Sequence, residues 1–268
     1  MRRKIILILL ISLFPAAFLN AADKRELPLD NYSDIFLTTV RADIVIIPAG
    51  KNPPEIKWRS KYCRLEVKEA ADNVLQINVT PKPQHVFLKE ILGIEQYRCR
   101  ITLELPEDKN IYASSTQGSI KLQNIKAKSA RLYTAEGNID IDDYHGSLTA
   151  ETLTGRIAAR ALNCPAADFK SASGNIFAVG AMKHVNMLNT SGASRLHGIM
   201  EVLRFYSSEG DLLAVWEELP QNPLEISARS FAGNLEIILP PKTDPSDKKN
   251  NIHLKTFYGK ALVSARAS

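Results

Sequence analysis

Three carboxylates and an imidazole stand close together in the middle of the chain, at Asp140, Asp142, Asp143 and His145. Such a group can do two kinds of chemistry. A pair of carboxylates cleaves glycosidic bonds, and several carboxylate oxygens together bind calcium. Asp140 and Asp142 are two residues apart, which places them on the same face of a β-strand. A third interpretation is therefore that these acids are charges on a solvated sheet.

The residues that we expect beside these acids favour the third interpretation. When the internal repeats described below are aligned, Asp140 lies beside Lys121, and Asp142 lies beside Arg160. A base next to each acid predicts ion pairs between neighbouring strands. We therefore expect no catalytic, cofactor-binding or metal-ligating residues in this cluster. The glycan-processing pair and the calcium site remain the alternatives.

The other polar motifs predict no active site either. His145, His184 and His197 stand 8, 10 and 5 residues after the glycines of their repeats, so they lie at different places on the fold. The chain has no Cys-x-x-Cys zinc motif and no Gly-x-Ser-x-Gly nucleophile motif. We expect a protein without enzymatic activity and without a cofactor. The alternative is a polysaccharide-processing enzyme, by analogy with other parallel β-helices.

The three cysteines are Cys63, Cys99 and Cys164. Cys63 and Cys99 both lie in strand-like segments of the N-terminal third, and an exported compartment permits a disulfide between them. The two residues are either bridged or both free. Cys164 is left over in both cases.

The elements that must position all these residues follow from an internal repeat. Glycines recur at intervals of 18 or 19 residues, and two longer copies follow at Gly233 and Gly259. The regular positions are Gly118, Gly137, Gly155, Gly174, Gly192 and Gly210.

Apolar residues alternate with polar ones on both sides of each glycine, which is the pattern of a strand with one buried face. Ala130 and Leu132 precede Gly137, for example, and Ile139 and Ile141 follow it. At about 3.3 Å per residue, a straight 18-residue repeat would span roughly 60 Å, so each repeat must bend. The sequence therefore predicts an all-β fold, a β-solenoid (parallel β-helix-like) with one rung of about 18 residues per repeat. A flattened β-sandwich or prism of the same repeats is the alternative.

A second column of the repeat holds small polar residues that face inward. Stacked rungs would bring these side chains together in a ladder that hydrogen-bonds along the stack or to the turn at the glycine. A buried binding channel is the alternative interpretation. The column lies three residues before each glycine, at Ser115, Thr134, Thr152, Ser171, Asn189, Ser207, Ser230 and Thr256.

The N-terminal third is also strand-like but less regular. Since a solenoid must shield the open edge of its first rung, we expect residues 23–106 to form a β-rich cap section, and residues 107–268 to form a repeat section continuous with it. The strands that we expect in the cap are Ile44–Ile47, Glu55–Trp58, Arg64–Val67, Val74–Val79 and Arg100–Leu105.

Two segments interrupt the strands. Residues 86–94 have apolar side chains three and four apart, as in an amphipathic turn of helix. We expect this segment to cover the end of the solenoid, and a loop that binds a partner or touches a membrane is the alternative. Residues 242–251 are polar, which predicts a mobile loop.

The first 22 residues have the layout of a signal peptide. A basic start at residues 2–4 precedes an apolar run over residues 5–19, and Ala21 and Ala22 offer a cleavage site. The run is shorter than the roughly 20 residues that cross a bilayer, which favours cleavage over an uncleaved anchor. We expect export by general secretion to the periplasm or the cell surface, with no stable membrane span after signal cleavage.

The charge of the chain argues against a nucleic-acid partner. The 34 Lys and Arg against 29 Asp and Glu give a net charge of +5. Three of the bases belong to the leader, so the remaining chain carries 31 bases and 29 acids, a net charge of +2. This near balance lacks the excess of bases that binding to phosphates needs.

Four segments in this order resemble the bacterial β-strand-repeat proteins labelled "putative adhesin", a family of uncharacterised function related to adhesin head domains. The resemblance covers about residues 35–263, with Ala42 in place of the glycine that is common before the aspartate. It implies an exported, repetitive β domain and brings no catalytic residues. The segments are Ala42–Ile46, Val74–Ile77, Ile101–Pro106 and Ser115–Ile120.

We therefore expect an exported, non-enzymatic protein of the cell envelope or cell surface. Its partner is expected to be an envelope protein or a glycan, which binds in an adhesin-like manner to the long strand face. A purely structural role in the periplasm is a further alternative.

Overall fold

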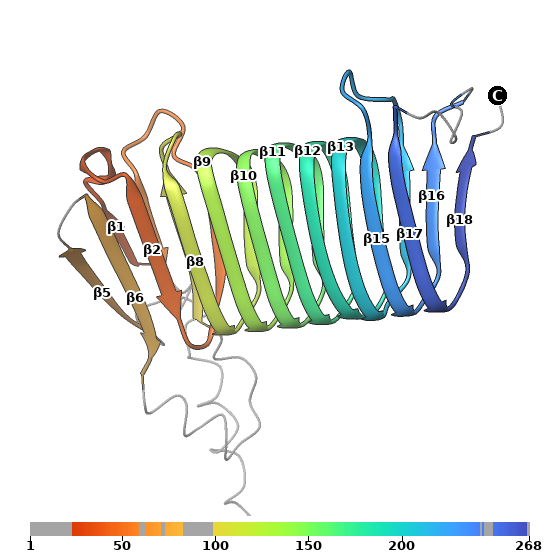
Figure 1. Cartoon of the computed structure of the whole chain (residues 1–268). Helices are drawn as coiled ribbons and strands as arrows, with labels where there is room; N and C mark the ends of the chain where they lie inside the picture. Colours follow the sequence, from red (N-terminus) through yellow and green to blue (C-terminus); the bar gives the residue numbers. More distant parts are fainter. Residues whose placement is uncertain are drawn as a thin grey trace, which may run out of the picture.

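The computed structural model describes residues 23–58, 63–70, 73–82, 99–241, 243 and 249–266. The expected signal peptide of residues 1–22, the segment 86–94 and most of the segment 242–251 lie outside the described residues. Asn251, which the polar composition of the segment 242–251 places in a loop, begins a strand instead. Figure 1 shows the described chain as one elongated stack of strand rungs, with the N-terminal strands at one end and the C-terminal strands at the other.

The middle of the stack consists of five rungs that each contain one long, bent strand. Neighbouring rungs are parallel and in register, so that Ile139 is aligned with Ile120 on one side and with Ile157 on the other. The predicted β-solenoid is therefore confirmed. The five strands are β9 (Ile120–Glu136), β10 (Ile139–Thr154), β11 (Ile157–Ser173), β12 (Ile176–Ser191) and β13 (Ser194–Glu209).

Each rung bends at two corners. The first corner is the repeated glycine. The second lies six residues later, where the backbone takes a left-handed conformation at Asn124 (φ 53°), Asp143 (φ 52°) and Ala161 (φ 51°). The corners divide the stack into two long faces. Face A is the outward side of the strand segments that precede the glycines, and face B is the outward side of those that follow them.

The glycines are required because successive first corners touch. A Cβ atom on Gly137 would lie 2.3 Å from the carbonyl oxygen of Gly118, and one on Gly155 would lie 2.0 Å from that of Gly137. No side chain can occupy such a position unless the backbone of the preceding rung moves. The regular spacing of glycine thus reflects close backbone contact between rungs.

The inward polar column joins the same corners. Thr134 Oγ1 donates a hydrogen bond to the Gly118 carbonyl oxygen at 2.9 Å, and Thr152 Oγ1 donates to that of Gly137 at 3.1 Å. The predicted ladder to the glycine turn is confirmed, and it takes the form of a bond to the preceding rung. Ser171 Oγ is buried without a partner. The same bond is made by Ser115 to Ala42, Asn189 to Gly174, Ser230 to Gly210 and Thr256 to Gly233.

A second ladder runs directly after the corners, and the sequence analysis missed it. Asn138 Oδ1 accepts a hydrogen bond from the Arg156 backbone N–H at 3.0 Å, and Asn175 Oδ1 accepts one from Ala193 N–H at 2.9 Å. The signal was the recurrence of Asp or Asn at this position. It occurs at Asp43, Asn138, Asn175, Asp211 and Asn234, each of which accepts such a bond.

The inward residues of all rungs form one continuous core. Its large side chains include Phe169, Phe205 and Trp216, which are fully buried. Trp216 and Tyr144 bring polar groups into this core and both find partners, since Trp216 Nε1 donates to the Met200 carbonyl and Tyr144 Oη donates to the Ser147 carbonyl. Each large apolar side chain that is buried in this way contributes about 1.5–3 kcal/mol.

The N-terminal end does not follow chain order. The rung of β2 and β3 lies between the rung of β6 and β7 and the rung of β8 and β9. The rung that is second in the stack, of β2 and β3, thus precedes the outermost rung, of β6 and β7, in the sequence. The strands are β2 (Asp34–Thr39), β3 (Ala42–Pro48), β6 (Val74–Pro81), β7 (Cys99–Leu105) and β8 (Asn110–Gln117), and a short 3-10 helix (Leu29–Asn31) precedes β2.

Antiparallel strands close this end. β5 (Cys63–Ala70) pairs with β6, β4 (Glu55–Trp58) pairs with β7, and β1 (Asp23–Glu26) pairs with β4. These strands cover the outer edges of both strands of the outermost parallel rung, β6 and β7. The cap continues directly into the repeat section through the ladders of β2 and β3.

The two long repeats at the C-terminal end have inserted loops at the second corner. The glycine corners of Gly233 and Gly259 remain stacked on the preceding ones. The loops divide each rung into separate strands, which explains the wider glycine spacing. These strands are β14 (Leu212–Trp216), β15 (Glu225–Ala232), β16 (Leu235–Leu239), β17 (Asn251–Tyr258) and β18 (Ala261–Ala265).

Candidate binding face

The acidic cluster is split by the fold. Asp140 and Asp142 lie on face B, where Asp140 is aligned with Lys121 and Asp142 with Arg160, as expected. The ion-pair partner of Asp140 is nevertheless Arg156, whose Nη2 lies 3.0 Å from its Oδ1. Pairing between rungs is therefore confirmed for Asp140, and the partner that we named for it is wrong. Arg156 is reached along the diagonal of the sheet, which simple alignment does not consider.

Asp143 belongs to the second corner and not to the outward face. Its left-handed backbone matches that of Asn124 and Ala161 in the neighbouring rungs, a conformation that Asp and Asn adopt more readily than most residues. Its Oδ1 lies 3.3 Å from His145 Nε2. His197 lies instead beside Glu217, at 3.3 Å. Within the described ranges, no three His, Cys, Asp or Glu side chains are grouped as a metal site would require.

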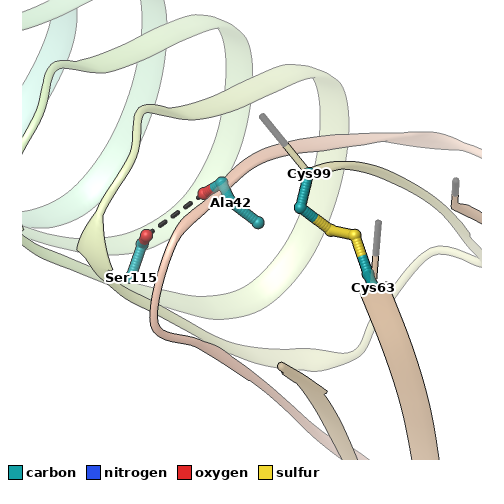
Figure 2. The surroundings of a disulfide bond; sticks show 4 residues. All are labelled: Ala42, Cys63, Cys99 and Ser115. Atoms are coloured by element: carbon teal, nitrogen blue, oxygen red, sulfur yellow. Dashed lines mark hydrogen bonds between the residues drawn. A yellow bond between two sulfur atoms is a disulfide. The ribbon is translucent and has the colours of Figure 1, made fainter. Parts of the chain in front are cut away.

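Cys63 and Cys99 form a disulfide, and their Cα atoms are 6.1 Å apart. Figure 2 shows this bond beside the corner of Ala42, whose carbonyl accepts the Ser115 hydroxyl. Cys99 is aligned with Ala42 in the ladder between β7 and β3.

Cys164 is a free, buried cysteine. Burial raises the pKa of its thiol to about 12, so the reactive thiolate is scarce at neutral pH. Burial also raises the pKa of Tyr144. Both groups belong to the core.

An ion-pair network covers the N-terminal end of face B. Lys57 Nζ lies 2.5 Å from an oxygen of Glu55 and 2.5 Å from an oxygen of Glu104. The hydrogen bonds to Glu104 and Glu55 raise the pKa of Lys57, and the hydrogen bond from Lys57 lowers the pKa of Glu55. These contacts join β4 to β7, so the network attaches the cap strand to the stack.

Face A carries most of the exposed apolar side chains. Nine of the twelve large hydrophobic residues that are exposed in the described chain lie on this face or at its edge. An exposed apolar surface of this kind often marks an interaction site. The nine residues are Phe36, Val40, Tyr133, Leu153, Leu188, Tyr206, Phe231, Phe257 and Tyr258.

The N-terminal half of face A forms a shallow groove of about 480 Å³. The rings of Phe36 and Tyr112 stack with centroids 4.2 Å apart, and the Arg131 guanidinium lies 5.6 Å from the Tyr112 centroid. Further along the groove, Lys170 Nζ lies 3.8 Å from a Glu151 oxygen. The groove thus combines aromatic rings with positively and negatively charged side chains, which can donate and accept hydrogen bonds. We call it the aromatic groove; it is lined by Phe36, Thr38, Tyr112, Ala113, Ser114, Arg131, Leu132, Tyr133, Thr149, Glu151, Asp168 and Lys170.

A second cluster lies at the C-terminal end of the same face. Arg229 Nη1 donates to Tyr206 Oη at 3.0 Å, and the Lys255 ammonium lies 5.0 Å from the Phe257 centroid. Phe231 packs against Phe257. The repeat pattern predicts binding through the long strand face, whereas these aromatic and basic columns become visible only in the fold.

The arrangement suits recognition of an extended surface. Rings and guanidinium groups offer apolar and cation–π contacts, while the paired acids and bases offer hydrogen bonds to hydroxyl and amide groups. Such residues are typical of the contact points of protein interfaces.

In the part of the chain that the structure describes, no helix is long and apolar enough to cross a bilayer.

The geometry defines a parallel β-solenoid of two-cornered rungs with a mixed aromatic and charged outer face. Residues 32–259 match the Toastrack DUF4097 family, so the chain belongs to that family. The expected resemblance to bacterial strand-repeat proteins is thereby confirmed. No curated protein matches the sequence.

A solved structure with a TM-score above 0.5 shares this architecture over nearly the whole chain. A crystal structure of a "putative adhesin" from Bacteroides fragilis is 13% identical, covers 92% of this chain and 97% of its own, and has a TM-score of 0.51. A "putative adhesin" from Parabacteroides distasonis is 12% identical, with coverage of 92% and 96% and a TM-score of 0.48. At such identities the likeness shows the fold alone.

Proposed function

We propose that the protein is an exported, non-enzymatic binding protein of the cell envelope or cell surface, which holds a protein or glycan partner on face A. The observation that carries the proposal is the aromatic groove, where the stacked Phe36 and Tyr112 lie beside Arg131 on a rigid set of strands. Strands that pair on both sides hold the side chains of the groove in place, which lowers the entropic cost of binding.

The name of the similar Bacteroides fragilis structure, a "putative adhesin", supports the same class of function. The absence of catalytic activity is supported by the environments of the acids. Asp140 is paired with Arg156, and Asp143 occupies a corner. Perturbed pKa values often mark active sites, but those of Tyr144 and Cys164 arise in the core.

The proposal is tested by retention of partners from a bacterial envelope extract and on a glycan array. The test variant is the double substitution Tyr112→Ala with Arg131→Ala. Its matched control is Phe177→Ala with Arg160→Ala, which removes a similar aromatic–cation pair, at 5.9 Å, from face B. We expect the wild-type protein and the control to retain the same partner, and the test variant to lose at least nine-tenths of it.

Two results would contradict the proposal. Equal retention by the two double variants would place binding elsewhere than face A. Glycan cleavage that disappears in both Asp140→Asn and Asp142→Asn would identify an enzyme instead.

A further inference from the structure

The two ends of the stack differ in how they are closed. At the N-terminal end, antiparallel strands pair with both strands of the outermost parallel rung: β5 pairs with β6, and β4 pairs with β7. At the C-terminal end, β17 pairs with β15 and β18 pairs with β16, and no described strand pairs with their other edges. Figure 1 shows this last rung at the C-terminal end of the stack. Among the described residues, its outer backbone N–H and C=O groups therefore form an open edge, and such an edge can accept a further strand.

The core is also open at this end. Inward residues of the preceding rung, such as Ile226 and Ile237, are 1% and 0% exposed. Their counterparts Ile252 and Val263 in the last rung are only half-buried. An apolar side chain that is placed over these residues would bury apolar surface on both partners, which is favourable.

The charge of the last rung limits what can cover it. Residues 251–266 contain Lys255, Lys260 and Arg266 and no Asp or Glu. A second copy of this rung would bring like charges together across the new interface, which is unfavourable. An acidic strand would instead place its carboxylates beside Lys255 and His253, which face outward.

Lysine on an edge strand is also a common protection against aggregation. That function alone does not explain the neighbouring side chains. Phe257 is 64% exposed and Tyr258 is 70% exposed, directly beside the open edge. A protected edge would be expected to carry few such residues, whereas exposed apolar side chains that lie together often mark an interaction site.

We infer that the open edge of β17 is a docking site for an extended peptide strand of a partner protein, whose residues alternate between apolar and acidic. Backbone hydrogen bonds would extend the sheet, and side chains on alternate sides would supply specificity. The apolar residues would lie over Ile252 and Leu254, and the acidic residues beside Lys255. This site lies at the end of the stack and is separate from the aromatic groove.

The existing rungs indicate a sequence for a parallel peptide. The Gly259 carbonyl has the position that accepts a bond from the inward polar column in earlier rungs, as Gly233 does from Thr256. A peptide that continues the pattern reads Ile-Glu-Leu-Glu-Thr, with the threonine reaching that carbonyl. This sequence, extended by one serine at each end and labelled with fluorescein, is the probe.

Binding of the probe to the protein is measured by fluorescence anisotropy. We expect saturable binding that Lys255→Glu weakens at least tenfold, and that Lys51→Glu, in a turn of the N-terminal section, leaves unchanged. A peptide with lysine in place of glutamate should show the reverse preference toward the Lys255→Glu variant. Two further peptides carry N-methyl groups on their backbone amides, one on the odd-numbered residues and the other on the even-numbered residues. Only one of them should bind, because a strand pairs through one edge.

Four outcomes would overturn this inference. They are no saturable binding, equal binding of a peptide of the same composition with its glutamates grouped, equal loss in the two lysine variants, and a dimer in sedimentation that excludes the peptide. The groove variant Tyr112→Ala with Arg131→Ala should bind the peptide normally. A failure of this site is therefore distinguishable from a failure of the groove.

Discussion

The Gly118 carbonyl oxygen accepts a hydrogen bond from Thr134 in the next rung, and the same oxygen would lie only 2.3 Å from a Cβ atom on Gly137. In each such corner, one carbonyl oxygen thus both accepts the hydrogen bond from the next rung and limits the size of the residue that packs against it. The inward polar side chain stabilises the approach of two rungs, and the glycine makes the approach possible. This unit recurs along the stack and holds the outer faces in register.

The contact at the corner can be separated from backbone strain by three substitutions to alanine. Gly137→Ala introduces the close contact with the carbonyl of the preceding rung. Gly155→Ala introduces the same kind of contact and also places a Cβ atom on a residue with a left-handed φ of +143°. Gly50→Ala has φ +61° with no heavy atom within 4 Å, so it introduces strain alone. We expect Gly50→Ala to cost about 1 kcal/mol and the other two to cost about 3 kcal/mol or more in the free energy of unfolding. Urea denaturation measures all three. Equal costs for Gly50→Ala and Gly137→Ala would refute the role of the corner contact.

The inward ladder can be tested with a partner and a non-partner. Thr152→Val removes the hydroxyl that donates to Gly137 and keeps the shape of the side chain. We expect it to lower the free energy of unfolding by about 1–2 kcal/mol, because a buried hydrogen bond is lost. Ser171→Ala is the control, since its buried hydroxyl has no hydrogen-bond partner among the described residues. If the control costs as much as Thr152→Val, the hydrogen bonds of the ladder do not explain its composition.

The three cysteines should differ in their reactivity toward iodoacetamide at pH 8. We expect no modification of the native protein, because Cys63 and Cys99 are bridged and Cys164 is buried with a pKa of about 12. Unfolding without reductant should expose one thiol, and unfolding with reductant should expose all three. Intact-mass spectrometry counts the additions. Two or more additions before reduction would show that the bridge is absent.

Loss of the disulfide should destabilise the cap section. It joins residues 36 apart in the sequence, and a loop of this length corresponds to about 3–4 kcal/mol. Replacing Cys63 and Cys99 together by serine should lower the melting temperature, whereas Cys164→Ala should have a smaller effect. Calorimetry with and without reductant gives an independent check, since reductant should change only proteins that retain the bridge.

The network around Lys57 predicts a dependence of stability on acid. The pKa of Glu55 is lowered in the folded protein by its hydrogen bond from Lys57. Its contribution is therefore present above the ordinary glutamate pKa and is lost as the pH falls through the lowered value. We expect Glu55→Gln to reduce the melting temperature at pH 7 and to make little difference at pH 3. A gap of the same size at both values would contradict this account.

The sequence predicted the repeat section well because its signals are local. The glycine, the alternation around it and the inward polar column recur at a fixed spacing, and each has one dominant physical cause. The order of the N-terminal rungs has no such signal. Nothing near Phe36 in the sequence indicates that its ring stacks on Tyr112, which is 76 positions away. The aromatic groove was missed for this reason, and the partner of Asp140 was misassigned because side chains reach diagonally between rungs.

The central claim, that a partner binds on face A, is tested most directly by hydroxyl-radical footprinting. Oxidation of individual aromatic side chains is measured by mass spectrometry with and without a bacterial envelope extract. We predict that Phe36 and Tyr133 become protected, while Phe177, which has similar exposure on face B, reacts at the same rate as before. Unchanged oxidation of Phe36 and Tyr133, or protection of Phe177 alone, would contradict the account.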